Sequence, residues 1–154
     1  MNEYNSMDIA KKIQENGQIV FGKAEIPEVV HFLYTQLPEC KIMAFSGPLG
    51  AGKTTLIREL LRKCGITEPI TSPTFIYVNR YKNDKNQLFY HFDLYRIDRL
   101  EDFLQAGFDE YLEDPNSLCF IEWPEVIEPI LKNNCCYITL DYHNDKRELR
   151  IKKL

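Results

Sequence analysis

The sequence has few of the residues from which proteins build zinc sites. Only three histidines are present, and none of the five cysteines belongs to a C-x-x-C pair. Because zinc sites need clustered cysteine and histidine ligands, we expect no zinc site here. The odd number of cysteines, without a signal peptide, favours a reducing compartment. We therefore expect a cytoplasmic protein in which Cys119 and Cys135 are buried thiols.

Long apolar runs and a surplus of basic residues are missing as well. No segment is apolar over a sufficient length to predict a membrane span. The net charge of −4 disfavours binding to nucleic acid through a broad basic surface, but it leaves room for work beside RNA within a complex. The 154 residues, 44% of them hydrophobic, predict one domain over residues 1–154 with a frayed start at residues 1–7.

The most informative segment of the sequence is a glycine-rich motif that ends in Lys-Thr. Residues 47–54 read Gly-Pro-Leu-Gly-Ala-Gly-Lys-Thr and fit the phosphate-binding P-loop pattern. An apolar run at 41–46 predicts a buried strand before the loop, and residues 55–64 predict a helix after it. This order of strand, glycine-rich turn and helix is the one that the motif requires.

The residue types in this loop fit a triphosphate chemically. Gly47, Gly50 and Gly52 allow a tight turn whose N–H groups converge on phosphate oxygens. The start of the following helix adds unpaired N–H groups and the positive end of the helix dipole. Lys53 supplies a full charge for the β- and γ-phosphates, and Thr54 offers a hydroxyl to Mg²⁺.

The remaining pattern predicts an α/β fold, a single P-loop NTPase domain. Helices are expected over residues 7–15, 26–37, 55–64, 100–106, 108–112 and 125–131, and strands over 41–46, 75–82, 87–93, 117–122, 135–142 and 147–152. Two strand pairs are separated by short turns and predict antiparallel hairpins. We therefore expect a mixed, mostly parallel sheet with helices on both faces and the P-loop at the carboxyl ends of the parallel strands.

Two carboxylates qualify as the second anchor for Mg²⁺. Glu122 ends the apolar run Leu-Cys-Phe-Ile-Glu, and Asp93 ends Leu-Phe-Tyr-His-Phe-Asp. One can hold metal while the other orders the attacking water, and the alternative for each is an acid that simply faces solvent. Arg96 and Arg99 follow closely and can neutralise phosphate charge, or they can form surface ion pairs with the acids at 101 and 102.

Four other side chains have two interpretations each. Ser72 and Thr74 lie in a Thr-Ser-Pro-Thr segment that resembles a switch loop near a γ-phosphate, although a plain turn fits equally well. Trp123 can pack near the nucleotide or simply be buried at a strand end. For His91 we expect packing or solvent exposure, since no neighbouring acid or nucleophile marks it.

Five blocks of sequence together resemble one family. They are Gly-Pro-Leu-Gly-Ala-Gly-Lys-Thr-Thr (47–55), Ser-Pro-Thr-Phe (72–75), His-Phe-Asp-Leu-Tyr-Arg (91–96), Gly-Phe-Asp-Glu-Tyr (107–111) and Glu-Trp-Pro-Glu (122–125). Their order and spacing are similar to those of the TsaE (YjeE) family over roughly residues 18–142. The P-loop alone is a weak marker of family, whereas the H-x-D-x-Y-R and E-W-P blocks make the resemblance specific.

The resemblance implies a small P-loop fold that binds ATP with Mg²⁺ and hydrolyses it weakly when alone. It implies TsaB and TsaD as partners in the threonylcarbamoyladenosine modification of tRNA position A37. In that scheme TsaD performs the transfer, and this subunit uses ATP to reset the complex and meets tRNA only indirectly. Position 48 is Pro where many members have Asp. Because that side chain is not expected to contact phosphate, the difference does not change the expected function. The last dozen residues match only loosely.

Motif and resemblance together define the expected site. The catalytic residues are Lys53, Asp93 and Glu122, and the metal ligands are Thr54 and Glu122. The nucleotide-binding residues are Gly47, Leu49, Gly50, Ala51, Gly52, Lys53, Thr54, Thr55, Thr74 and Trp123.

Two other functions stay open at this point. One is a P-loop kinase of a small metabolite. Such kinases usually have an arginine-bearing lid late in the sequence, and residues 100–131 contain no arginine, which disfavours this function. The other is a nucleotide-gated assembly subunit with negligible catalysis.

Overall fold

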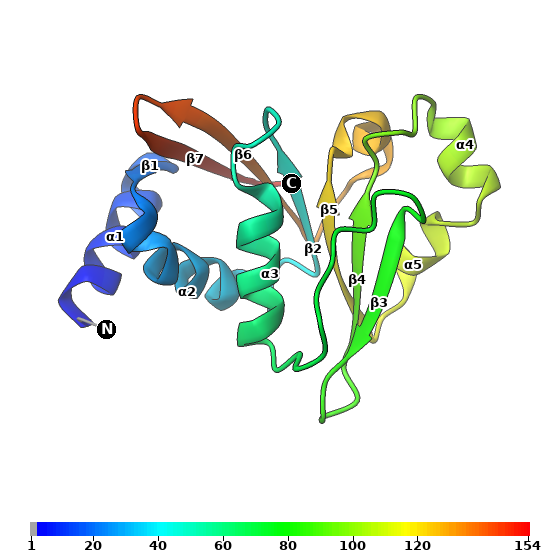
Figure 1. Ribbon diagram of the computed structural model, residues 1–154, viewed down its shortest axis with the longest axis horizontal. Helices are drawn as coiled ribbons and strands as arrows, with labels where there is room; N and C mark the ends of the chain where they lie inside the picture. The colour runs from blue at the N-terminus through cyan, green and yellow to red at the C-terminus, as the bar shows by residue number, and fades with distance from the viewer. Residues whose placement is uncertain (1–2) are drawn as a thin grey trace.

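The computed structural model describes residues 3–154, with side chains from residue 8 onward. Its centre is a seven-stranded sheet in the order β1-β7-β6-β2-β5-β4-β3 (Figure 1). The strands are β1 (Gln18–Phe21), β2 (Ile42–Ser46), β3 (Val78–Lys82), β4 (Leu88–Asp93), β5 (Ser117–Glu122), β6 (Cys135–His143) and β7 (Lys146–Lys153). The inner strands β6, β2, β5 and β4 are parallel, and the β3–β4 and β6–β7 hairpins are antiparallel. The predicted mixed sheet with two hairpins is thereby confirmed.

Helices cover both faces of the sheet, as expected. Their bounds are α1 (Glu3–Asn16), α2 (Ile26–Gln36), α3 (Lys53–Lys63), α4 (Leu100–Gln105) and α5 (Asp109–Glu113), with 3-10 helices η1 (Lys23–Glu25) and η2 (Pro124–Ile130). Along β2, Met43 and Phe45 join the core under α1, α2 and α3, whereas Ala44 joins the core under α4, α5 and η2. This alternation follows from the pleat of the strand and separates two apolar cores.

The P-loop leaves the carboxyl end of β2 and turns directly into α3. Gly47 has φ +148°, and a Cβ added there would lie 2.3 Å from the carbonyl oxygen of Leu140 in β6. Only glycine allows the loop to pass so close to a neighbouring strand. Gly52 has φ +104° and caps the N-terminus of α3, so the loop ends in a conformation that other residues rarely adopt.

Several predicted boundaries were wrong. The strand predicted over 75–82 begins only at Val78, because the backbone before it turns through Tyr77 at φ +68°. The helix predicted over 125–131 is present as the 3-10 helix η2. Its 3-10 form accords with Pro129, which has no N–H to give to an α-helical hydrogen bond. The strand β1 was not predicted, since its four residues are too few to show a pattern. Helix α1 begins at Glu3, within the stretch expected to fray, and residues 1–2 lie outside the described residues.

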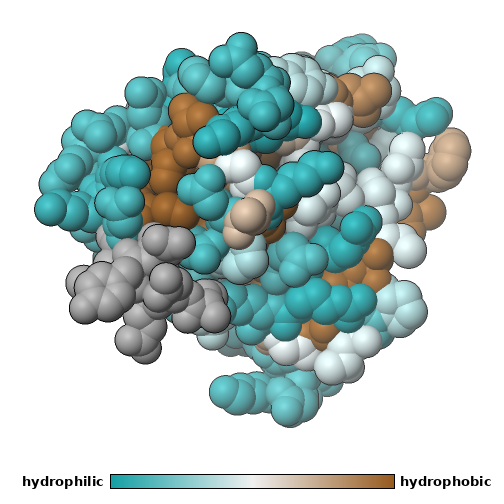
Figure 2. Space-filling model, turned by 60° about the vertical axis from the view of Figure 1, so that its left-hand side comes forward, coloured by the Kyte–Doolittle hydropathy of each residue, from teal (hydrophilic) through white to brown (hydrophobic). Residues whose placement is uncertain are grey.

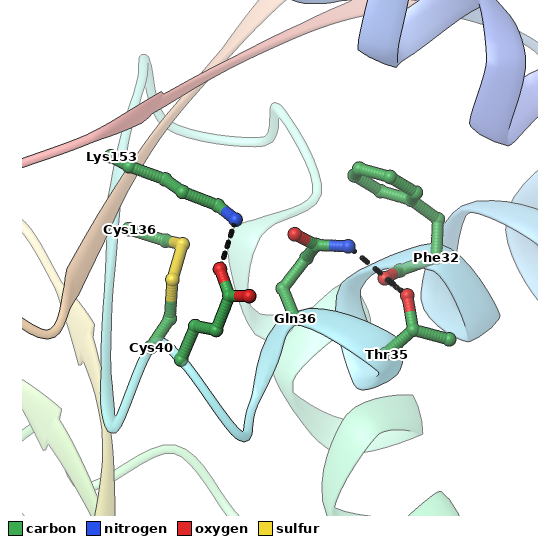
Figure 3. Close-up of a disulfide and its surroundings, with 7 residues drawn as sticks. Phe32, Thr35, Gln36, Cys40, Cys136 and Lys153 are labelled. Atoms are coloured by element: carbon green, nitrogen blue, oxygen red, sulfur yellow. Dashed lines mark hydrogen bonds and ion pairs between the residues drawn. A yellow bond between two sulfur atoms is a disulfide. The ribbon is translucent and has the colours of Figure 1, made fainter.

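The cysteines show a pairing that their spacing does not predict. Cys40, before β2, forms a disulfide with Cys136 in β6, across a sequence separation of 96 residues (Figure 3). Beside it Lys153 pairs with Glu39 at 2.6 Å. Cys119 and Cys135 are buried free thiols, as expected, and burial raises the pKa of Cys119 to about 12.

The face that carries α1 and α2 is mostly hydrophilic, with separate apolar areas (Figure 2). No helix in the described part of the chain is long and apolar enough to cross a membrane.

Candidate nucleotide-binding site

Lys53 lies at the first turn of α3 with its side chain folded back over the P-loop. Its ammonium donates to the carbonyl oxygen of Gly47 and, at 3.2 Å, to that of Pro48. The same Nζ lies 3.7 Å from the centre of the Trp123 ring. Burial lowers the pKa of Lys53, and nearby carboxylates, Glu122 foremost, oppose that shift. The charge is thus held at the loop by weak acceptors that phosphate oxygens can replace.

The two predicted carboxylates lie next to each other at the carboxyl end of the sheet. Asp93 and Glu122 are register partners at the ends of the parallel strands β4 and β5. They are 8% and 3% exposed, so neither is an acid that simply faces solvent. Oε1 of Glu122 accepts a hydrogen bond from the Thr54 hydroxyl at 2.5 Å, which joins the acid of β5 to the P-loop. The sequence alone left this placement open.

His91 is fully buried, which is one of the two predicted alternatives, but the expectation that no acid partners it was wrong. Its Nε2 lies 2.7 Å from Oε2 of Glu122. The partner is 31 residues away in the sequence, on the adjacent strand, so local pattern could not reveal it. His91 thereby belongs to the polar cluster under the P-loop and not to the apolar packing alone.

The Thr-Ser-Pro-Thr segment lies across from the P-loop and contacts the acid of β4. The Ser72 hydroxyl donates to Oδ2 of Asp93 at 3.3 Å, and the Thr74 hydroxyl donates to Ser72 at 3.4 Å. The backbone N–H of Tyr95 donates to the other oxygen, Oδ1, at 3.1 Å. Asp93 is therefore held in place while it still borders the cavity.

These groups surround one cavity of about 410 Å³ beside the P-loop. Its lining includes Ser72, Thr74, Asp93, Glu122 and Trp123, together with the loop residues from Leu49 to Thr55. Trp123 is half-buried, and its ring packs against Tyr95 with centroids 4.9 Å apart. Of the expected site residues, Gly47 alone is outside this lining, and its carbonyl binds Lys53 instead.

The two arginines have different surroundings. Arg96 lines the cavity, and its guanidinium lies 4.7 Å from the centre of the exposed Phe75 ring. Arg99 forms an exposed ion pair with Glu101 at 3.5 Å, which is the surface alternative that the sequence left open. Only Arg96 is therefore within the site.

A second cavity, of about 340 Å³, lies on the other side of the P-loop. It shares Gly50, Ala51, Gly52 and Thr55 with the first, so the two cavities meet along the loop. Its remaining walls come from α3, through Leu56, and from the segments around the β1–α2 connection and the β6–β7 turn: Phe21, Gly22, Lys23, Ile26, Asp145, Lys146 and Arg147. Sequence reasoning missed the residues of these two segments because they follow no motif and are brought together by the pairing of β1 with β7.

The donors in the first cavity fit Mg²⁺. The hydroxyl of Thr54 and the carboxylates of Glu122 and Asp93 are oxygen ligands, which this hard cation prefers. Among the described residues no cluster of three or more His, Cys, Asp or Glu side chains could hold a metal ion by itself. Mg²⁺ commonly takes one or two protein ligands and fills its shell with phosphate oxygens and water.

The comparisons with known proteins point to one family. The family model described as "Threonylcarbamoyl adenosine biosynthesis protein TsaE" matches residues 21–150. A Haemophilus influenzae protein named "tRNA threonylcarbamoyladenosine biosynthesis protein TsaE" is 36% identical, with 89% of this chain and 84% of the relative covered. A protein of the same name from Rickettsia prowazekii is 39% identical, with 86% of this chain and 91% of the relative covered. The crystal structure of YdiB from Bacillus subtilis has the same fold, with a TM-score of 0.65 at 26% identity over 88% of this chain and 85% of that one.

Proposed function

Because this chain belongs to the TsaE family, whose members are named for threonylcarbamoyladenosine biosynthesis in tRNA, we propose that it is the Mg²⁺-dependent ATPase subunit of that machinery. The observation that carries the proposal is the hydrogen bond between Thr54 and Glu122 at the cavity beside the P-loop. It joins a P-loop hydroxyl to a strand-end acid, which is the arrangement that P-loop ATPases use to hold Mg²⁺.

The triphosphate is expected along the P-loop, with its γ-end in the first cavity. There Lys53 exchanges its two carbonyl acceptors for phosphate oxygens, and the loop N–H groups bind the remaining charge. Thr54 and Glu122 are the residues that would hold Mg²⁺. When bound, the metal neutralises negative charge on the β- and γ-phosphates.

Asp93 is the residue that we propose to orient the attacking water. Two hydrogen bonds fix its carboxylate, and it borders the cavity beside Glu122. A fixed carboxylate that accepts a hydrogen bond from water directs the lone pair of that water toward phosphorus. Glu122 hydrogen-bonds Thr54, the other proposed Mg²⁺ ligand, so we assign it to the metal rather than to the water.

The nucleoside is expected in the second cavity. The two cavities meet at Gly52 and Thr55, so a nucleotide that follows the loop passes from one into the other. Phe21, Ile26 and Leu56 supply apolar surface for a base. Lys23 lines the same cavity and can bind a ribose hydroxyl or the α-phosphate.

The partner surface is expected around the mouth of the first cavity. Leu49, Phe75, Ile76 and Tyr95 are large apolar side chains that are all more than half exposed. Leu49 and Tyr95 line the cavity itself, and Phe75 lies against Arg96. Exposed apolar side chains gathered near a site are typical of protein interfaces, and TsaB and TsaD are the partners that we propose. The net charge of −4 supports only indirect contact with tRNA.

The decisive experiment measures ATP hydrolysis with Mg²⁺ for the protein alone and with the purified cognate TsaB–TsaD pair. We expect weak turnover alone and strong stimulation by the pair, with both abolished in Lys53→Ala. Nucleotide binding without stimulation would contradict the proposal. ADP formation driven by one small acceptor would instead identify a metabolite kinase, and complex formation that needs ATP without turnover would identify a gating subunit.

A further inference from the structure

We propose that His91 is a positioning residue, which holds the Glu122 carboxylate in the orientation that the Thr54 hydroxyl needs. The proposal rests on the proposed ATPase function for its consequence, but the contact itself is a property of the protein without nucleotide. In the described part of the chain His91 hydrogen-bonds Glu122 and is not part of the cavity lining, so it acts through the acid and is not itself a catalytic residue.

The strand register places His91 next to the paired acids Asp93 and Glu122. On β4, His91 is paired with Phe120 of β5, and two residues later Asp93 is paired with Glu122. Because side chains alternate along a strand, His91 and Asp93 point to the same face, toward α3. The imidazole therefore lies on the same face of the sheet as the Glu122 carboxylate, at the neighbouring position of the adjacent strand. Its exposed fraction is 0%, so neither water nor the cavity separates the two groups.

The Glu122 carboxylate is held at both of its oxygens by different elements. Oε1 accepts from Thr54 of α3 at 2.5 Å, and Oε2 lies 2.7 Å from His91 Nε2 of β4. A glutamate side chain has several rotatable bonds, and a single hydrogen bond leaves its carboxylate free to swing. Two bonds from opposite sides fix the plane of the carboxylate before any ligand binds, and such a preformed arrangement costs no reorganisation during the reaction.

The other ring nitrogen of His91 argues against a purely structural role. Its Nδ1 is buried and has no hydrogen-bond partner among the described side and main chains. Leaving a buried polar atom unpaired lowers stability, and an apolar residue of similar size would avoid that loss. A histidine at this position is therefore explained by the bond that its Nε2 makes to Glu122.

The contact can be tested without ATP, by a double-mutant cycle on thermal unfolding. The variants are His91→Leu, Glu122→Leu and the double variant, each measured in the absence of nucleotide and metal. We expect the unfolding temperature of the double variant to fall by clearly less than the sum of the two single shifts, because either change alone removes the same bond. Additive shifts would overturn the proposed positioning of Glu122 by His91, whether or not the protein hydrolyses ATP.

The effect of His91 on the Mg²⁺ requirement is tested by measuring nucleotide binding and turnover at increasing Mg²⁺ concentration. Trp123 is the only tryptophan and packs against Lys53, so its fluorescence reports binding at the site. We expect His91→Leu to raise the Mg²⁺ concentration for half-maximal response about 10- to 100-fold, while metal-free ATP binding stays within about twofold. His91→Gln carries an amide nitrogen near the position of Nε2 and should restore most of the response.

A control is available at a second histidine, outside the nucleotide site. His31 of α2 also has a buried Nδ1 without a partner in the described structure, but it lies away from the P-loop. His31→Leu should therefore leave the Mg²⁺ requirement unchanged. An equal rise in both leucine variants, or a loss of metal-free binding in His91→Leu that His91→Gln does not restore, would show a structural role only. If nucleotide binding and turnover by the wild-type protein do not depend on Mg²⁺, the proposed ATPase function is refuted instead. The unfolding cycle would still test whether His91 positions Glu122.

Discussion

Replacing Gly47 with alanine tests how closely the nucleotide site depends on the packing of the P-loop against β6. The added Cβ would lie 2.3 Å from the carbonyl oxygen of Leu140, whereas such contacts need at least 3.0 Å, so the backbone must move by about 0.7 Å. Leu140 is fully buried in the core and cannot give way easily. At φ +148° the alanine is also strained whatever space it finds.

The magnitude follows from these two effects. Steric overlap in a packed region costs about 1–3 kcal/mol, and an unfavourable backbone conformation costs about 1–3 kcal/mol more. Gly107→Ala is the matched control, because Gly107 has φ +77° but no atom within 4 Å of an added Cβ. It should show the conformational cost alone, so the two variants should differ by about 1–3 kcal/mol in unfolding free energy.

The assay combines urea unfolding with ATP turnover. The carbonyl of Gly47 also accepts a hydrogen bond from Lys53, so a displaced loop misplaces the lysine as well. We expect Gly47→Ala to lose on the order of 10²-fold in turnover while Gly107→Ala keeps it. If both variants have the same unfolding midpoint, or if Gly47→Ala turns over ATP normally, the close approach of the loop to β6 does not matter as argued.

Three further predictions concern the site and the core. Thr54→Val should abolish the Mg²⁺ stimulation of turnover, while Thr54→Ser keeps it because it retains the hydroxyl; equal Mg²⁺ titrations for the two variants would contradict the assignment. Lys23→Ala should weaken binding of ATP but not of inorganic triphosphate in a competition assay, and equal losses for both would argue against a nucleoside in the second cavity. Burial raises the pKa of Cys119 to about 12 in the folded protein, so between pH 9 and that value the folded state binds more protons than the unfolded state, and stability falls as pH rises. The urea midpoint should drop from pH 8 to pH 10, and by less in Cys119→Ala.

The structure changes how Glu122 should be mutated. From the sequence we expect Glu122→Ala and Thr54→Ala to impair turnover more than folding. Glu122 is 3% exposed and is the acceptor for both Thr54 and His91, so the alanine variant leaves a fully buried imidazole without its partner. Such a loss costs about 1–3 kcal/mol of stability. Glu122→Gln, which keeps the size and one acceptor oxygen, is the cleaner probe of the metal role.

Local pattern was sufficient for most elements of the fold. The β3–β4 and β6–β7 hairpins and the break between α4 and α5 at Gly107 depend on short-range turn chemistry. The expectation of a mostly parallel sheet followed from apolar runs such as those of β2 and β5, which the structure pairs in parallel. The errors lie where long-range packing overrides local preference, as at the turn before Val78 and in the four-residue strand β1.

The candidate site divides in the same way. By itself the sequence determined the phosphate-binding loop and the family, because glycine, lysine and threonine at fixed spacing specify a backbone shape and its chemistry within one short segment. Only the tertiary structure decided that Glu122 lies between Thr54 and His91 and that a second cavity adjoins the loop. Those contacts depend on which strands are neighbours and in what register, and register is set by the packing of the whole sheet.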